Sequence, residues 1–398
     1  MPISRKIAEN LGRSSWIRKM FEEGERLRRE RGPEAVFDYS LGNPDQEPPP
    51  EFREALLALA EDPPPGIHRY MSNAGYTESR AAVARRLAEE TGLSVTAEHV
   101  VMTCGAGGAL NVILKTLLNP GEEVVVVAPY FVEYGFYIEN HGGRVVVAES
   151  GEDFQLDLDS LARAVGPRTR ALIINSPNNP TGAVYPAESL RALDELLAAK
   201  EAEFGTAIYV ISDEPYAKLV YDGVRVPPVF PLLRHSLIAT SHSKDLALAG
   251  ERIGYAAVNP RIPDADQIAA GMVFANRTLG FVNAPALMQR LVAGLQGMAV
   301  GVESYRERRD ILYDHLVSLG FEVVKPAGAF YLFPKSPIPD DVAFAQMAAR
   351  HGLLIVPGSG FGRPGYFRLA YCLPKETILR SLPVFTALAR EVGLVKGK

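Results

Sequence analysis

Residues 237–258 read Leu-Ile-Ala-Thr-Ser-His-Ser-Lys-Asp-Leu-Ala-Leu-Ala-Gly-Glu-Arg-Ile-Gly-Tyr-Ala-Ala-Val, two apolar runs around a polar turn. The runs Leu237–Ser241 and Gly254–Val258 are typical of strands that are buried on both faces. Lys244 lies in the turn that follows the first run. Because open α/β sheets bind ligands at the carboxyl ends of their strands, this segment predicts both a sheet and a site at its edge.

The same pattern continues on the N-terminal side of this segment. Further strand-like runs cover Val124–Ala128, Arg144–Ala148, Ala171–Asn175 and Ile208–Ser212. Helical stretches lie between or before them, over Thr77–Glu90, Ala106–Leu118 and Ala187–Lys200. Repeated alternation of strand and helix over roughly residues 95 to 260 predicts an α/β fold, with a mixed, mostly parallel sheet between helices.

The two ends of the chain follow a different pattern. A charged helical segment, Trp16–Arg31, leads into the proline-rich stretch 43–50. After residue 283 the sequence predicts a long helix, short strands that include Glu322–Val324 and Ala329–Phe333, and a last helix from about Lys375. We therefore expect a smaller α+β domain built from both chain ends. The expected boundaries are 1–48 and 296–398 for this domain and 49–295 for the large one.

Composition excludes several classes of protein. Of 398 residues, 47% are hydrophobic and 22% charged, as in a globular protein. The net charge of −5 provides no broad positive field for nucleic acid. The two cysteines, Cys104 and Cys372, form neither a disulfide framework nor a metal-binding spacing. No apolar stretch approaches the roughly 18 residues of a membrane span, so we expect a cytoplasmic protein with no metal.

The turn around Lys244 contains residues suited to a reactive amine and a phosphate. Burial lowers the pKa of a lysine, and the neutral amine can attack a carbonyl to form an imine. Ser241, Ser243 and Arg252 are hydrogen-bond donors of the kind that bind a phosphate dianion. Taken alone, however, this motif also fits a lysine in a surface turn.

Three further motifs follow other predicted strands. In Ser212-Asp213-Glu214-Pro215-Tyr216 a carboxylate could hold a cationic ring nitrogen or simply cap a helix. The segment 176–182, Ser-Pro-Asn-Asn-Pro-Thr-Gly, is a tight turn that presents an asparagine amide. The glycine-rich segment 104–109 joins a strand to a helix, as phosphate-binding turns do, but it matches neither the dinucleotide nor the P-loop motif.

Taken together and in this order, these motifs resemble the class I/II aminotransferases, pyridoxal-phosphate (PLP) enzymes of fold type I with the aspartate aminotransferase architecture. The resemblance runs from Leu41-Gly42-Asn43-Pro44 to Phe367-Arg368-Leu369. It implies that Lys244 holds PLP as an internal aldimine and acts as the general base. Asp213 would pair with the ring nitrogen, Asn179 and Tyr216 would bind the phenolate oxygen, and Tyr130 would stack on the ring. The implied phosphate ligands are Ser241, Ser243, Arg252 and the amides of Gly105 and Ala106.

The resemblance also implies substrate contacts and a partner. Arg368 fits the arginine that binds the substrate α-carboxylate, beside Gly42 and Asn179. Tyr70 matches a tyrosine that reaches the phosphate of the neighbouring subunit, which implies a homodimer with shared active sites. Ile17 is expected to supply an apolar wall. Arg277 is a candidate for binding an acidic side chain, with a surface arginine as the competing interpretation.

The reaction implied is ping-pong transfer of the amino group of an L-amino acid to a 2-oxo acid, with 2-oxoglutarate as the expected acceptor. Aspartate, aromatic, alanine and branched-chain donors stay open, because Gly107 stands where some prokaryotic aspartate aminotransferases carry a lysine. Two alternatives share the cofactor motifs: a lyase that cuts C–S bonds or forms a cyclopropane, and a PLP-binding regulatory protein. The second is disfavoured because the segment before the main body shows no helix-turn-helix pattern.

Overall fold

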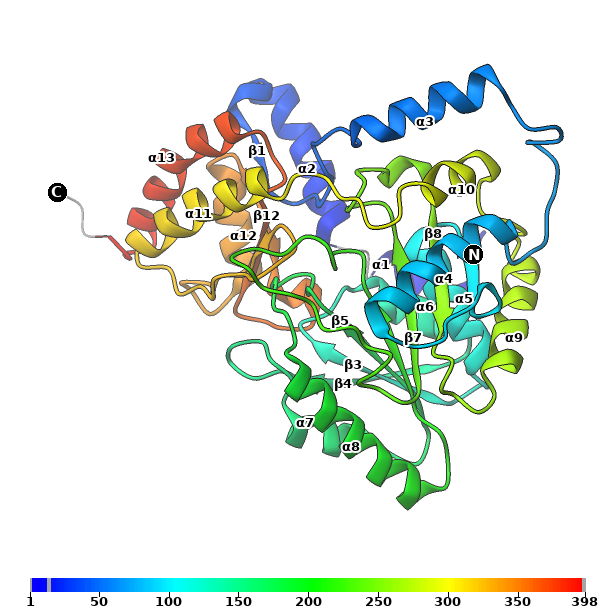
Figure 1. Ribbon diagram of the computed structural model, residues 1–398. Coiled ribbons are helices and arrows are strands. Elements are labelled where there is room, and N and C mark those ends of the chain that lie inside the picture. The colour runs from blue at the N-terminus through cyan, green and yellow to red at the C-terminus, as the bar shows by residue number, and fades with distance from the viewer. Residues whose placement is uncertain (1, 13–15, 396–398) are drawn as a thin grey trace.

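A seven-stranded sheet lies at the centre of the computed structural model, which describes residues 2–12 and 16–395 (Figure 1). The strand order is β2-β8-β7-β6-β5-β3-β4. The strands are β2 (Val100–Thr103), β3 (Glu123–Ala128), β4 (Arg144–Glu149), β5 (Thr169–Asn175), β6 (Tyr209–Asp213), β7 (Ser236–Ser241) and β8 (Gly254–Val258). β8 runs antiparallel to both of its neighbours, β2 and β7, and the other strand pairs of this sheet are parallel. The mixed, mostly parallel sheet predicted from the sequence is confirmed.

Helices cover both faces of this sheet, which explains its apolar strands. Val124 and Val126 of β3 pack in one buried cluster with α5 (Gly105–Leu117) and α9 (Ala265–Thr278). Val125 and Val127 pack in another, with residues of four helices. Those helices are α4 (Thr77–Thr91), α7 (Leu158–Ala164), α8 (Ala187–Phe204) and α10 (Ala286–Ala293). Since successive side chains of a strand point to opposite faces, burial on both sides requires an unbroken apolar run.

Both ends of the chain meet in a second lobe, where the blue α2 lies near the red α13 in Figure 1. Phe37 N donates to Gly352 O at 2.8 Å, and Tyr39 N donates to Leu354 O at 2.9 Å. The pair β1-β10 and the sheet β11-β12-β9 form its strands. They are β1 (Phe37–Asp38), β9 (Tyr331–Leu332), β10 (Leu353–Leu354), β11 (Val356–Pro357) and β12 (Phe367–Ala370). The helices are α2 (Trp16–Arg31), α11 (Glu303–Ser318), α12 (Asp341–Arg350) and α13 (Lys375–Glu391). The domain boundaries stay a prediction.

One predicted strand is absent from the described structure: residues Glu322–Val324 are irregular. Lys335 N donates to Glu322 O at 2.9 Å, but this contact does not extend into a ladder. Pro326 follows Glu322–Val324, and Pro334 precedes Lys335. Prolines lack the amide hydrogens that a ladder of hydrogen bonds needs. The prediction for Glu322–Val324 was therefore wrong.

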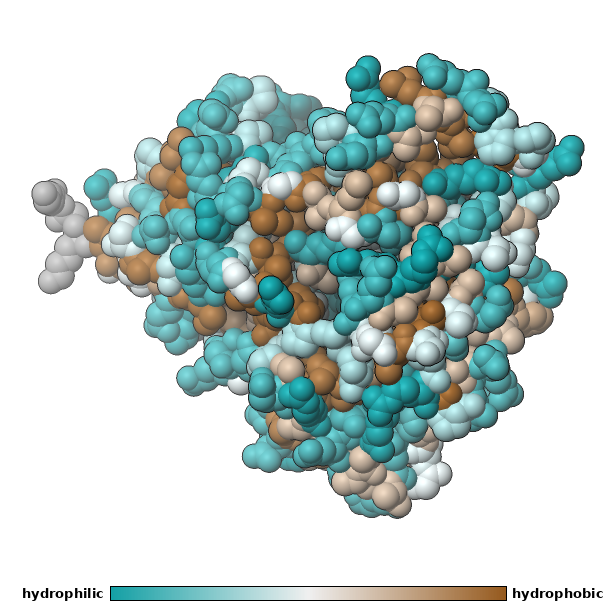
Figure 2. Space-filling model, viewed as in Figure 1, coloured by the Kyte–Doolittle hydropathy of each residue, from teal (hydrophilic) through white to brown (hydrophobic). Residues whose placement is uncertain are grey.

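Hydrophilic side chains cover most of the face shown in Figure 2, and hydrophobic ones gather where the α11–α13 lobe meets the rest of the molecule. Among residues 2–12 and 16–395, no helix has the length and apolar character of a membrane span. Within the same residues, no group of three or more His, Cys, Asp and Glu side chains is placed to hold a metal ion.

Candidate active site

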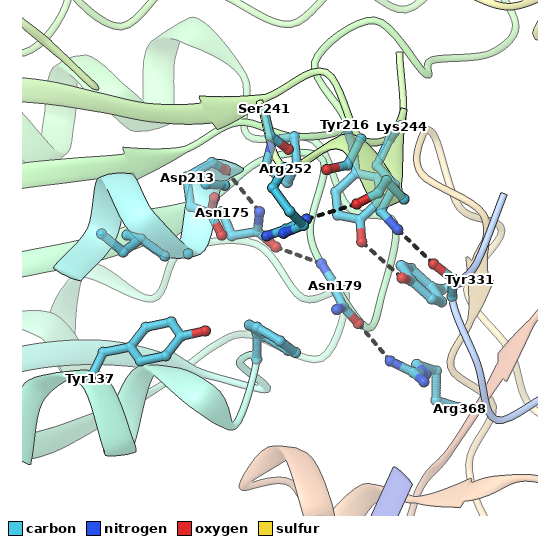
Figure 3. A pocket seen from close by; sticks show the side chains of 18 residues that line it. Tyr137, Asn175, Asn179, Asp213, Tyr216, Ser241, Lys244, Arg252, Tyr331 and Arg368 are labelled. Atoms are coloured by element: carbon cyan, nitrogen blue, oxygen red, sulfur yellow. Dashed lines mark hydrogen bonds between the residues drawn. The ribbon is translucent and has the colours of Figure 1, made fainter. Parts of the chain in front are cut away.

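A cavity of about 310 Å³ lies at the carboxyl ends of β5, β6 and β7, where the two lobes meet (Figure 3). Many of the residues predicted from the sequence line it. They are Gly42, Ala106, Asn179, Asp213, Tyr216, Ser241, Ser243, Lys244, Arg252 and Arg368. Because residues up to 326 positions apart in the chain converge there, from Gly42 to Arg368, the cavity exists only in the folded chain.

Lys244 extends from the turn after β7 into this cavity. Its Nζ donates to the Gly42 carbonyl oxygen at 2.6 Å, and the Phe330 ring centroid lies 5.4 Å from Nζ. Burial lowers the pKa of this lysine to about 8. At pH 7 about a tenth of this amine is therefore neutral, far more than for an exposed lysine. The neutral amine is the form that attacks carbonyl carbons and accepts protons.

Asp213, the last residue of β6, is a buried carboxylate with one oxygen unused. Its Oδ2 accepts a hydrogen bond from Tyr134 Oη at 2.5 Å, whereas Oδ1 has no partner among the described residues. Burial raises the pKa of Asp213 to about 7, and the hydrogen bond from Tyr134 opposes this rise. A buried acceptor of this kind is suited to a cationic N–H group that enters the cavity.

One end of the cavity collects groups that bind anions. Ser241, Ser243 and Arg252 line it beside Ala106 in the first turn of α5. Gly105 begins α5 with a φ of +73°, and a Cβ there would lie 2.8 Å from Arg252 Nη2. The positive φ favours glycine here, and the absence of a Cβ lets the Arg252 guanidinium lie close to the backbone. Two hydroxyls, a guanidinium and a helix N-terminus together fit a phosphate.

Arg368 on β12 supplies a second cation, and its side chain is 2% exposed. Nη1 donates to Asn179 Oδ1 at 3.1 Å, Nη2 donates to Ser40 O, and Nε has no partner among the described residues. The rings of Tyr331 and Phe361 each lie 4.8 Å from its Cζ. Burial lowers the pKa of Arg368. Since no carboxylate of the described chain forms an ion pair with it, a carboxylate ligand fits this place.

Several residues of the site were not predicted from the sequence. Tyr331 lines the cavity, and its hydroxyl lies 2.8 Å from that of Tyr216. Asn175 Nδ2 donates to the Asp213 carbonyl at 2.8 Å, and Asn175 Oδ1 accepts from Asn179 N at 2.6 Å. Tyr134 belongs to α6 (Glu133–Asn140). The only sequence signal that could have indicated Tyr134 was its position, about one helical turn after the Ala-Pro-Tyr segment at the end of β3.

The expectation for Tyr130 needs correction, because Phe131 lines the cavity instead. Tyr130 N donates to Phe361 O at 3.0 Å, and its ring lies 2.7 Å from where a Cβ on Gly362 would stand. The Tyr130 ring therefore packs against the smaller lobe. The aromatic residue of this segment that lines the cavity is Phe131.

Two other predicted residues, Tyr70 and Arg277, lie outside this cavity, and the side chain of a third, Ile17, is not described. Tyr70 is 90% exposed. Arg277 is exposed near the end of α9, with its Cζ 5.2 Å from the centroid of the Phe274 ring. The side chain of Ile17 lies outside the described part of the chain. Within one protomer, Tyr70 and Arg277 thus have no contact with the residues around Lys244.

Comparison with known proteins gives consistent matches over most of the chain. The family model for aminotransferase class I and II matches residues 34–383. The aspartate/prephenate aminotransferase of Thermus thermophilus is 37% identical over 360 residues, which cover 89% of this chain and 90% of that protein. An amino transferase from Eubacterium rectale has a similar structure, with a TM-score of 0.95, 37% identity, and coverage of 98% and 99%. An aspartate aminotransferase from Thermus thermophilus, solved with maleate, gives a TM-score of 0.84, 33% identity, and coverage of 94% and 97%.

Proposed function

Because the chain belongs to the class I and II aminotransferase family and is an aminotransferase, we propose that it uses PLP to transfer the amino group of an L-amino acid to 2-oxoglutarate. The observation that carries this proposal is that one cavity is lined by the amine of Lys244, the carboxylate of Asp213 and the guanidinium of Arg368. Asp213 Oδ1 and Arg368 Nε have no hydrogen-bond partner among the described residues.

The residues present fit this cofactor. When bound, PLP supplies an aldehyde for Lys244 and an electron-withdrawing ring that stabilises negative charge at the substrate Cα. The unpartnered Oδ1 of Asp213 suits its ring nitrogen. Tyr216 and Asn179, which line the cavity, would donate hydrogen bonds to its phenolate oxygen, and Phe131 would make the ring contact first expected of Tyr130. Its phosphate ligands would be Ser241, Ser243, Arg252 and the amides of Gly105 and Ala106.

The remaining residues bind the substrate and move its protons. Arg368 holds the α-carboxylate with a planar fork of donors, which fixes the orientation of the Cα–H bond. Lys244, with its lowered pKa, accepts the proton from Cα and returns one in the reverse direction. Gly42 lines the cavity near Arg368 and keeps Nζ of Lys244 in place through its carbonyl oxygen.

The amino donor is proposed to be aspartate, or a broader set of amino acids. The similarity to an aspartate/prephenate aminotransferase supports acidic donors. Among the described residues that line the cavity, the cations are Lys244, Arg252 and Arg368. All three have other roles, so an acidic side chain would need a further cation. Arg277 could supply it only from a partner subunit, because it lies outside the cavity of its own chain.

The proposal includes a homodimer with shared active sites. A tyrosine as exposed as Tyr70 leaves a large apolar ring in water within a single protomer. A second copy of the chain packed against Tyr70 would remove that exposure. In such a dimer Tyr70 would reach the anion-binding end of the partner's cavity. Equilibrium sedimentation of the purified protein tests the dimer, and a monomer at micromolar concentration would contradict it. The cytoplasmic location stays a prediction.

A half-reaction screen tests the proposed function. The purified yellow protein is mixed with each amino acid, without acceptor, and the loss of its visible absorbance is followed. We expect conversion to the pyridoxamine spectrum, fastest with the true donor, and return of the yellow form on addition of 2-oxoglutarate. Release of pyruvate and ammonia from cystathionine without an acceptor would instead indicate a lyase.

Arg368→Lys is expected to raise KM for the amino acid by about 10- to 100-fold, with a smaller change in kcat. The reason is the loss of a bidentate, charge-assisted contact contributing about 1.5–3 kcal/mol. Steady-state kinetics with the donor from the screen measure both constants. Arg363→Lys is the control, since Arg363 pairs with Glu149 at 2.5 Å and does not line the cavity. An unchanged KM in Arg368→Lys would contradict the assigned role.

A further inference from the structure

Tyr331 occupies a junction between the two lobes that no sequence motif indicated. It lies on β9, paired with Ala370 of β12, two residues from Arg368. In an antiparallel pair, residues i and j±2 on one face are close diagonal neighbours. Tyr331 and Arg368 are therefore held on the same face of a small sheet, and this face lines the cavity (Figure 3).

The hydroxyl of Tyr331 contacts the larger lobe through Tyr216. The two oxygens lie 2.8 Å apart, and the side chains are 2% and 5% exposed. The rings meet edge to face, with centroids 5.7 Å apart. Two buried hydroxyls at this distance share one proton between them, so each fixes the direction in which the other donates.

The same side chain contacts two other residues of the site. Its ring lies 4.8 Å from the Arg368 guanidinium carbon, within the range of a cation–π contact. A Cβ on Gly42 would stand 2.1 Å from its hydroxyl oxygen, so the Gly42 backbone packs directly on Tyr331. Lys244 Nζ donates to the Gly42 carbonyl. Tyr331 therefore contacts Tyr216 and Arg368 directly and the hydrogen-bond partner of Lys244 as well.

We propose that Tyr331 is a positioning residue with two separable actions, an inference that rests on the proposed function. Its hydroxyl donates the shared proton to Tyr216 Oη, so that Tyr216 keeps its own O–H directed at the cofactor phenolate. Its ring holds the Arg368 guanidinium in place through the cation–π contact, so that the N–H donors of Arg368 face the substrate carboxylate. The hydroxyl thus acts on the cofactor and the ring on the substrate.

The first action is tested by the pH titration of the visible absorbance of the Lys244-bound cofactor. A weaker donor at Tyr216 leaves the phenolate more basic, so the proton it shares with the lysine nitrogen is held more tightly. Tyr331→Phe should therefore raise the titration midpoint by about 0.3 to 1 pH unit. Tyr216→Phe should raise it further, and adding Tyr331→Phe to that variant should produce no additional shift.

The second action is tested by the amino acid concentration that half-saturates the half-reaction. Tyr331→Leu removes the ring and should raise this concentration by about 3- to 30-fold. Tyr331→Phe keeps the ring and should stay within about twofold of wild type. If Tyr331→Leu does not fold, the titration of Tyr331→Phe still decides the first action.

Tyr305→Phe is the matched control. Tyr305 is 0% exposed, packs against Phe330 in the same apolar cluster, and has a hydroxyl with no hydrogen-bond partner in the described structure. It should titrate like wild type. A Tyr331→Phe midpoint equal to that of Tyr305→Phe, or an additive shift in the double variant, would overturn the inference. A wild-type protein without a titrating visible band would instead overturn the proposed function.

Discussion

Lys244→Ala is expected to lower turnover by at least about four orders of magnitude and to abolish the visible absorbance of the purified protein. One substitution removes both the amine that joins the cofactor and the base that moves the Cα proton, and each contributes several powers of ten. The structure supports both roles, because Nζ reaches into the cavity and burial lowers its pKa to about 8.

Steady-state kinetics and absorbance spectra measure this loss. Borohydride reduction of the wild type, followed by proteolysis and mass spectrometry, should place the pyridoxyl adduct on the peptide containing Lys244. Lys335→Ala is the control, since Lys335 is a 54% exposed lysine that pairs with Glu322. A Lys244→Ala protein that keeps its yellow colour and its turnover would remove the basis of every role assigned here.

Asp213→Asn is expected to lower turnover by about two to three orders of magnitude, since breaking a buried charge pair costs about 3–5 kcal/mol. An amide cannot supply the negative charge that keeps the cofactor ring nitrogen protonated. The expected signature is a slowed half-reaction together with faster release of the cofactor. Both are measured from the visible spectrum, and an unchanged half-reaction rate would contradict the role of Asp213.

Asp213→Asn should increase the stability of the cofactor-free protein at alkaline pH, although it lowers turnover. Burial raises the pKa of Asp213 from 3.8 to about 7, so the folded form keeps a proton that the unfolded form loses. The stabilising contribution is present below about pH 4 and is lost as the pH rises through about 7. At pH 8 cofactor-free Asp213→Asn should therefore melt at a higher temperature than wild type, and this difference should shrink at pH 5.

Asp222→Asn provides a control of opposite sign. Its hydrogen bond with Arg309 lowers the pKa of the Asp222 carboxyl, so ionisation of Asp222 favours the folded form. Asp222→Asn should then lower the melting temperature at pH 8. If Asp213→Asn lowers it as well, the carboxylate of Asp213 is satisfied within the protein, and its unpartnered oxygen does not await a ligand.

Local sequence predicted six of the seven strands of the central sheet, because most of them are buried on both faces and are apolar throughout; β2 (Val100–Thr103) was missed. Val124–Ala128 and Leu237–Ser241 lie within β3 and β7 for this reason. The smaller lobe was harder, since its strands are as short as the two residues of β9 and β10. Glu322–Val324 has comparable composition but gains no ladder, and only its proline neighbours and lack of a paired strand distinguish it.

Within the site, the sequence by itself was enough to identify the cavity residues that belong to motifs at strand ends. These are Lys244, Asp213, Asn179 and Arg252. A turn after a buried strand has little freedom, so its position follows from the chain. Tertiary structure alone decided that Phe131 and not Tyr130 faces the cavity, that Tyr134 meets Asp213, and that Tyr331 joins Tyr216 to Arg368. These contacts join distant segments, and their geometry depends on the direction of single side chains, which no local pattern encodes.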